Sequence, residues 1–359
     1  MMKHLTGKTA FITGGAGGLG KSLAKHLASQ GEIQPPRSFL WCLLWSGAHI
    51  SLFSRQLGPL EEAREEILAY RRNESQNVNI VAVDMGYADR VDEAFKSQPH
   101  VPDIVYFVAG GNYRHNGFFV DLSAEDLEDC MRNNYFSAAY AAKSLMDIWL
   151  AEDATSRKPG FRGSGSSSLS TARRHYSGSQ ARVPTPVSCI FLFSARADRN
   201  CRSHAASKAA VRALADTLRL EVLRHNTADS NYAVHCAFPG DFISPGFLKE
   251  QETKVHLNKT IQGLHQPVEK LAAKLPSSDQ VASMIMRAVD RGDFMITYSL
   301  EQHALFANML GASPKRGWGV VDTLLQPLMS CFVMPYLRSR WEALARQDGT
   351  ELRRSYVVR

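Results

Sequence analysis

The stretch Thr13-Gly14-Gly15-Ala16-Gly17-Gly18-Leu19-Gly20 decides the fold that the rest of the sequence predicts. The β-branched and aromatic run 9–12 before it predicts a buried strand, and apolar residues at helical spacing from Leu19 to Leu27 predict a helix. Glycines let the chain turn sharply and approach a ligand closely. The start of the following helix presents unpaired N–H groups that favour a phosphate. A strand, a glycine loop and a helix in this order predict a dinucleotide-binding site.

Length, composition and charge limit the class of protein. With 359 residues, of which 44% are hydrophobic, the chain can bury the core of one large α/β domain with extensions, or of two domains. The net charge of +7 raises the question of a nucleic-acid or anionic-membrane surface. However, segment 157–202 carries nine Lys or Arg residues against one acid, Asp198, so the rest of the chain is close to neutral. This local excess argues against a nucleic-acid surface.

The six cysteines are scattered and show neither metal-ligand nor C-x-x-C spacing. This pattern favours a reducing compartment with free buried thiols, and it predicts no metal site. The glycine loop begins almost at once, so we expect no signal peptide at the start of this sequence.

Strand and helix patterns alternate along the chain, which predicts an α/β fold with a doubly wound parallel sheet of the Rossmann type. The predicted strands cover 9–12, 48–53, 78–83, 104–108, 187–193, 232–237 and 294–297. The predicted helices cover 19–27, 60–70, 91–95, 124–130, 131–150, 204–224 and 279–291.

Two segments interrupt this alternation. Residues 32–47 separate the first helix from the second strand, although joining 31 directly to 48 would give a connection of ordinary length. Their apolar run is too short to cross a bilayer, which leaves an interfacial anchor or incorrectly retained translated sequence, and we favour the second. Residues 157–202 are basic and Ser-rich like a linker. We hypothesise that part of 160–202 also comes from a wrong frame or splice choice.

The second strand ends in Ser54-Arg55, and no acidic residue stands there. In a Rossmann unit an acid at this place binds the 2′-hydroxyl of NAD, whereas an Arg accommodates a 2′-phosphate, so we expect NADPH. The alternative is a solvated Arg at a strand end. Asp84 and the small-residue loop around Gly110 follow the next two strands, at the sheet edge where open α/β sheets bind ligands.

The uncharged apolar stretch 323–337 is short for a membrane span and contains two prolines. Aromatic and basic residues flank it (Trp318, Arg338, Arg340 and Trp341). These flanks favour a membrane-embedded or interfacial segment over a soluble core. We therefore predict a dinucleotide-binding domain over 1–300 and a membrane-associated extension over 301–359.

Several motifs in this order resemble the short-chain dehydrogenase/reductase family across most of 9–297. They are the glycine loop 13–20, Val108-Ala109-Gly110, Asn134, Ser207-Lys208 and Pro239-Gly240. The resemblance implies a single Rossmann domain that holds a nicotinamide cofactor along these motifs, with Gly110, Lys208, Pro239 and Gly240 among the cofactor contacts.

Within the family, stretches 209–219 and 238–247 resemble the 3-ketodihydrosphingosine reductases, and so do 311–314 and the apolar tail. The resemblance implies NADPH-dependent reduction of this long-chain lipid ketone to dihydrosphingosine, a step of sphingolipid biosynthesis. It also implies an endoplasmic reticulum membrane location with the catalytic domain facing the cytosol. Homo-oligomerisation stays open, and so does reduction of another lipid or steroid ketone.

The family uses a Tyr as the acid, a Lys four residues later, a Ser that binds the carbonyl and an Asn in a proton relay. Asn134 and Lys208 match, and Ser194 is the expected Ser. His204 stands where the family has Tyr. A neutral His can relay a proton, although a neighbouring Lys discourages its protonation. The alternative is that His204 only begins a helix, which would make the chain a catalytically impaired NADPH-binding protein.

Overall fold

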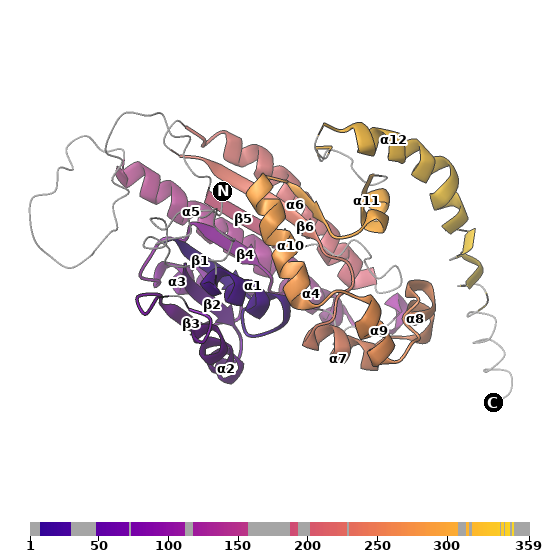
Figure 1. Cartoon of the computed structure of the whole chain (residues 1–359), viewed down its shortest axis with the longest axis horizontal. Coiled ribbons are helices and arrows are strands. Elements are labelled where there is room, and N and C mark those ends of the chain that lie inside the picture. Colours follow the sequence, from indigo (N-terminus) through magenta and orange to yellow (C-terminus); the bar gives the residue numbers. More distant parts are fainter. Residues whose placement is uncertain are drawn as a thin grey trace, which may run out of the picture.

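The structure is a computed structural model with a central sheet between helices, and it describes most of the chain outside two long segments (Figure 1). The described residues are 8–29, 48–71, 73–111, 118–156, 187–192, 202–227, 230–307, 314–315, 318–337, 339–340, 342–344 and 347. The predicted insertion 32–47 lies outside the described residues, and so does most of 157–202.

Seven parallel strands form the sheet in the order β3-β2-β1-β4-β5-β6-β7. They are β1 (Thr9–Thr13), β2 (His49–Ser54), β3 (Val78–Ala82), β4 (Ile104–Phe107), β5 (Val187–Leu192), β6 (Tyr232–Phe238) and β7 (Met295–Thr297). The strand order reverses between β1 and β4, and ligands of such sheets bind at this reversal. The predicted doubly wound parallel sheet is confirmed.

Helices cover both faces of the sheet, so the strands are apolar on both sides. In β1, Phe11 packs into one core cluster while Ala10 and Ile12 pack into the other, because successive side chains of a strand point to opposite faces. The covering helices are α1 (Gly18–Ser29), α2 (Leu57–Leu68), α3 (Ala88–Lys96), α4 (Ala124–Met131), α5 (Ser137–Ser156), α6 (Arg202–Leu223) and α10 (Ser278–Arg291). Six of these helices agree with the predicted ones within three residues at each end, whereas α5 begins and ends six residues later than the predicted helix 131–150.

A widened turn interrupts the helical stretch for which we predicted a helix over 131–150. Residues Arg132–Phe136 form the π-helical turn η3 between α4 and α5. Such turns are often found at functional sites, and this one contains the buried Asn134.

Three short helices that the sequence analysis missed follow β6. They are α7 (Pro245–Thr253), α8 (His256–Gln262) and α9 (Val268–Lys274), and they lie together near one end of α10 (Figure 1). Ser244 caps α7 by accepting a hydrogen bond from the Phe247 N–H, and Pro245 occupies the first helical position. Phe247, Leu264 and Leu271 form a small separate core beneath these helices.

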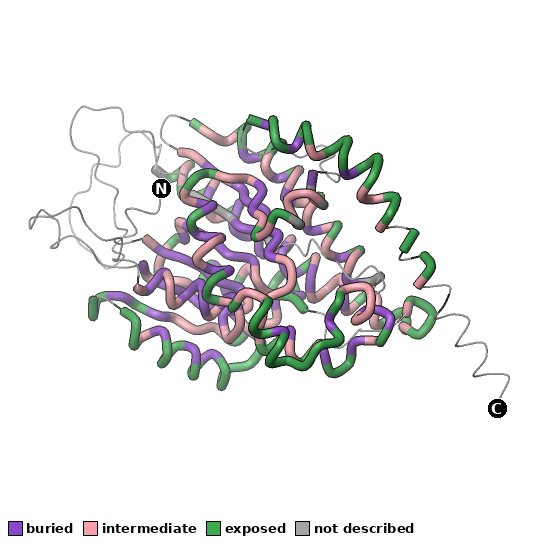
Figure 2. The backbone as a smooth tube through the Cα atoms, turned by 45° about the vertical axis from the view of Figure 1, so that its right-hand side comes forward, coloured by how far each residue is buried: buried purple, intermediate pink, exposed green. Residues whose placement is uncertain are grey.

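The C-terminal part begins with α11 (Leu300–Ala307) and continues through α12 (Val320–Leu328) and the π-helical turn η4 (Met329–Val333). In the described part of the chain, the helix Val320–Leu344 is long and apolar enough, by length and composition, to cross a membrane. Most of its surface is exposed (Figure 2).

Candidate nucleotide and substrate site

At its first bend the glycine loop needs a glycine, because the backbone of Gly14 is left-handed and a side chain there would collide with the loop after β4. The N–H of Gly14 donates to the Phe53 carbonyl at 2.7 Å, and Gly14 has a φ of +70°. A Cβ at this position would lie 2.9 Å from the Ala109 nitrogen. At Gly17, by contrast, a Cβ would meet nothing within 4 Å. The loop is therefore tied to the neighbouring strands on one side and open on the other.

Thr13 joins the two strands between which the strand order reverses. Its hydroxyl oxygen accepts hydrogen bonds from the backbone N–H groups of Val108 and Ala109, both at 3.1 Å. The loop after β4 is thereby fixed opposite the glycine loop, so the crevice between them is part of the fold.

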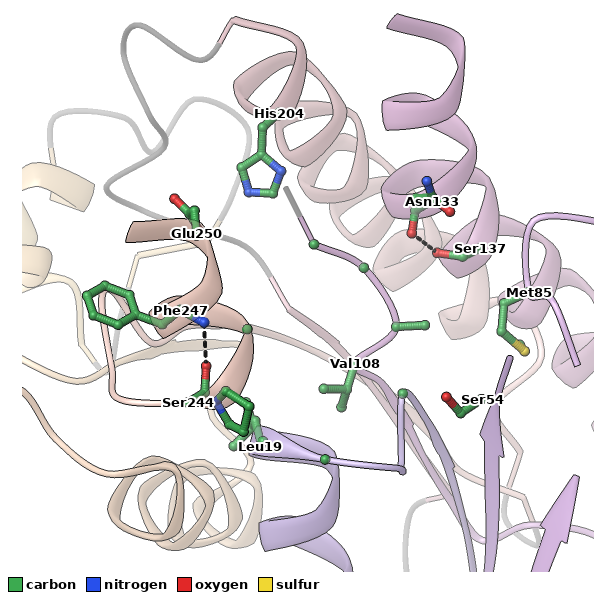
Figure 3. Close-up of a pocket in the computed structure, with 18 of the residues that line it drawn as sticks. Leu19, Ser54, Met85, Val108, Asn133, Ser137, His204, Ser244, Phe247 and Glu250 are labelled. Atoms are coloured by element: carbon green, nitrogen blue, oxygen red, sulfur yellow. Dashed lines mark hydrogen bonds between the residues drawn. The ribbon is translucent and has the colours of Figure 1, made fainter. Parts of the chain in front are cut away.

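A cavity of about 450 Å³ occupies this crevice (Figure 3). Most of the predicted site residues line it: Gly14, Gly17, Gly18, Leu19, Arg55, Asp84, Gly110, His204, Lys208, Pro239 and Gly240. Ala16, Gly20 and Asn134 do not line it, and Ser194 lies outside the described residues. A Cβ at Gly20 would collide with the carbonyl oxygen of Gly14, so Gly20 allows close packing behind the loop.

One end of the cavity carries the residues expected to select the nucleotide. Arg55 donates to the side-chain oxygen of Asn133 at 3.4 Å, a long and exposed hydrogen bond. Asp84 accepts a hydrogen bond from the Gly86 N–H at 2.9 Å. The weak bond to Asn133 leaves the Arg55 guanidinium able to pair with an anion at the end of β2.

Asn134 stands behind the cavity wall and holds its backbone. Its side-chain oxygen accepts from the Gly111 N–H at 3.1 Å, and its amide nitrogen donates to the carbonyl oxygens of Gly111 (3.2 Å) and Cys130 (3.0 Å). Asn134 therefore joins η3 to the loop after β4.

Lys208 and His204 reach the cavity from the same face of α6, one turn apart. The Lys208 Nζ would lie 3.3 Å from a Cβ placed on Gly110, and the Asn134 side-chain oxygen would lie 2.7 Å from it. Burial lowers the pKa of Lys208 to about 8, and no described carboxylate counters this effect.

His204 is buried and neutral. Burial, and then the positive charges of Lys208 and Lys254, lower its pKa to about 3. Its Nδ1 has no hydrogen-bond partner among the described residues. His204 therefore lines the cavity but does not carry a proton as an imidazolium near neutral pH.

At the end of the cavity that His204 and Lys208 line, the opposite wall is formed by α7. Phe247 and Glu250 of α7 lie across the cavity from His204 (Figure 3). Glu250 pairs with the buried ammonium of Lys254 at 2.8 Å, and Lys254 also donates to the Gln262 side chain at 2.7 Å. These bonds link α7 to α8, so the cover over the cavity is fixed by a buried ion pair.

Sequence reasoning missed the residues that α7 and α11 bring to the site. The helix signal Ser244-Pro245 could have revealed α7, because a Ser cap followed by Pro marks a helix start. Gln302 in α11 donates to the Pro239 carbonyl at 3.1 Å and occupies the space beside Gly240. No local sequence motif predicts this long-range contact between Gln302 and Pro239.

No protein-family model matches the chain. Among curated proteins, the chain is similar to the 3-ketodihydrosphingosine reductase of Aspergillus fumigatus, with 28% identity over 93% of this chain and 83% of that protein. The Neurospora crassa protein of the same name is 27% identical over 96% of this chain and 84% of its own length. The Bos taurus protein is 23% identical over 93% and 82%.

Solved structures of similar fold include a short-chain dehydrogenase and an L-sorbose reductase. A short-chain dehydrogenase from Sphingobium yanoikuyae in complex with NADPH has a TM-score of 0.58 and 15% identity, covering 90% of this chain and 95% of that one. L-Sorbose reductase from Gluconobacter frateurii, with NADPH and L-sorbose, has a TM-score of 0.55 and 21% identity, covering 80% and 91%. At these identities the similarity shows the fold of the chain.

Proposed function

Because the chain belongs to the short-chain dehydrogenase/reductase family, we propose that it reduces 3-ketodihydrosphingosine to dihydrosphingosine with NADPH. The observation that carries the proposal is the convergence of the glycine loop, Gly110 and Lys208 on one cavity at the strand reversal. The names of the relatives support the choice of a sphingoid ketone.

The cavity fits a dinucleotide. Gly17 leaves open space and Gly14 adopts a left-handed turn, so the loop can approach a pyrophosphate closely. Arg55 would hold the 2′-phosphate of NADPH, Asp84 would lie beside the adenine end, and Lys208 would contact the nicotinamide ribose. When bound, NADPH supplies the hydride for the reduction.

The reacting ketone fits the other end of the cavity, between His204 and α7. Phe247 offers an apolar contact for a long alkyl chain, and the pair of Glu250 with Lys254 fixes α7 above it. In this arrangement Asn134 keeps the Gly110-Gly111 backbone in place.

The exposed C-terminal helix supports the proposal of a lipid substrate. Leu324, Phe332 and Tyr336 are largely exposed on it, so an apolar face is available to a bilayer. We therefore propose that the protein acts at a membrane and, for a sphingoid ketone, at the cytosolic face of the endoplasmic reticulum.

A second candidate function rests on His204. Among the described residues that line the cavity there is no tyrosine, the family's usual acid. The second candidate is a protein that binds NADPH without turning over a ketone.

Incubating the purified full chain with NADPH and 3-ketodihydrosphingosine in mixed micelles tests both candidates. We expect ketone-dependent loss of NADPH absorbance with dihydrosphingosine as the product by mass spectrometry. Equal rates with steroid ketones or other long-chain ketones would shift the proposal to another substrate. Saturable NADPH binding without turnover of any ketone would overturn the proposal in favour of the second candidate.

A further inference from the structure

A ketone reduction needs one proton on the oxygen, and the described cavity offers few donors. Its lining includes Arg55 at the nucleotide end and the pair His204 and Lys208 at the other. A guanidinium group is not deprotonated in proteins and therefore cannot supply the proton. Among the described nitrogen acids that line the cavity, His204 and Lys208 on α6 therefore remain as candidate proton donors, beside water.

His204 is unsuited to the role. Its ring is buried and faces the positive charges of Lys208 on α6 and Lys254 directly after α7, and its pKa is lowered to about 3. Near neutral pH its N–H proton would have to leave a neutral imidazole, which is a far weaker acid than an ammonium. His204 therefore serves to fill and shape the cavity.

Lys208 has the position of a donor. Its ammonium reaches the loop at Gly110 together with the Asn134 side chain, and it lines the cavity one turn from His204. Lys254, the other lysine nearby, is held in its pair with Glu250 and does not line the cavity.

The titratable groups around Lys208 carry no charge that would hold its ammonium in the protonated form. The buried thiols of Cys130 on α4 and Cys236 on β6 and the neutral ring of His204 are the titratable groups that interact with it. Burial raises the pKa of the Cys236 thiol, so this group stays neutral. No described carboxylate raises the pKa of Lys208, so burial lowers it to about 8, close to the value that suits an acid near neutral pH.

We propose that Lys208 itself donates the proton to the carbonyl oxygen, taking the place of the missing tyrosine; this inference rests on the proposed reductase function. As the carbonyl carbon gains a hydride, the electron pair of the C=O π bond moves to oxygen and forms the O–H bond with a proton from Nζ. Lys208 is left as a neutral amine and regains a proton from water. Overall, ketone, NADPH and one proton give alcohol and NADP⁺.

The test compares kcat against pH at saturating NADPH and ketone in the wild type, Lys208→Arg and Lys143→Arg. Lys143 is an exposed lysine on α5 and serves as the matched control. We expect kcat of the wild type and the control to fall about tenfold per pH unit above pH 8, as the donor loses its proton. Lys208→Arg keeps the positive charge, but a guanidinium does not release its proton. We therefore expect kcat to fall roughly 10²- to 10⁴-fold and the plot of kcat against pH to show no inflection near pH 8.

A second arm separates proton donation from cofactor binding. Lys208→Ala leaves space for a small amine, so ethylamine should raise its kcat at least about tenfold at saturating NADPH, in proportion to the protonated amine. An unrescued Lys208→Ala, or an inflection near pH 8 that persists in Lys208→Arg, would overturn the inference while leaving the reductase function intact. An inflection lost only in His204→Phe would overturn it in favour of His204. Absence of turnover by the wild type would instead count against the reductase function itself.

Discussion

Asn134 and the backbone of Gly111 exchange two hydrogen bonds, from the Gly111 N–H to the side-chain oxygen at 3.1 Å and from the amide nitrogen to the Gly111 carbonyl at 3.2 Å. The widened turn η3 brings this side chain to the loop after β4. Asn134 thus fixes the cavity wall opposite the glycine loop without lining the cavity itself.

Asn134→Ala should therefore weaken both the fold and the site. Removing the amide leaves the N–H and C=O of Gly111 without these partners, so we expect the free energy of unfolding to drop by about 1–3 kcal/mol. NADPH affinity should fall as well, because the loop loses its anchor. Urea denaturation and nucleotide titration measure the two effects, and unchanged values for both would contradict the role assigned to Asn134.

Two alanine substitutions in the glycine loop should behave differently. Gly14→Ala places a Cβ against the Ala109 nitrogen at a φ of +70°, so we expect a loss of about 1–3 kcal/mol in stability. Gly17→Ala meets nothing within 4 Å, so it should fold normally yet weaken NADPH binding by filling the open side of the loop. Thermal denaturation and nucleotide titration of the pair check this, and equal stability of the two variants would argue against the described loop geometry.

Arg55→Gln should change the choice between nucleotides. The guanidinium lies at the cavity end where a 2′-phosphate would sit, and a charge-assisted hydrogen bond contributes about 1.5–3 kcal/mol. We expect the Kd for NADPH to rise roughly tenfold or more while the Kd for NADH changes little. If both constants change together, or neither changes, the 2′-phosphate is held elsewhere.

His204 should make the protein sensitive to acid. Its pKa is lowered to about 3 in the fold, whereas the unfolded chain takes up this proton near pH 6.5. The folded state therefore loses stability as the pH falls from about 6.5 towards 3. Between pH 6.5 and 4.5 the wild type should lose about 2 kcal/mol more than His204→Phe in urea denaturation. Equal losses in both proteins would mean that His204 is protonated in the fold.

The exposed face of the C-terminal helix should bind lipid. Leu324 and Phe332 are 69% and 70% exposed, so replacing both with Glu should reduce sedimentation with phospholipid vesicles. Val120→Glu changes an apolar residue that is even more exposed (87%), in the turn before α4, and serves as the control. Loss of vesicle binding in the control, or its retention in the double variant, would place the membrane contact elsewhere.

The sheet and the glycine loop were predictable because their signals are local. The apolar run 9–12 predicts β1 from its own residues, and the helical spacing after Gly18 predicts α1 in the same way. The repeated alternation of strands and helices then predicts the parallel sheet. The strand at Val187–Leu192 was also found inside the basic segment, since its apolar run stands out from the Ser-rich surroundings.

The cover of the cavity was not predictable to the same degree. Helices α7 to α9 have only seven to nine residues each, so their apolar periodicity is too short to distinguish from a loop. The buried pair of Glu250 with Lys254 and the contact of Gln302 with Pro239 depend on the tertiary fold. Likewise, the resemblance to the family predicts that His204 stands where the family has a tyrosine, but only the surroundings of the ring indicate that it stays neutral.

The central claim is that the glycine loop and the cavity beside it hold NADPH. Titrating the intact, folded chain with NADPH and following nucleotide fluorescence tests it most directly. The account predicts a saturable signal with one nucleotide per chain, weaker binding of NADH, and a weakened response in Gly17→Ala. A folded protein that gives no saturable signal with either reduced nucleotide would contradict the claim.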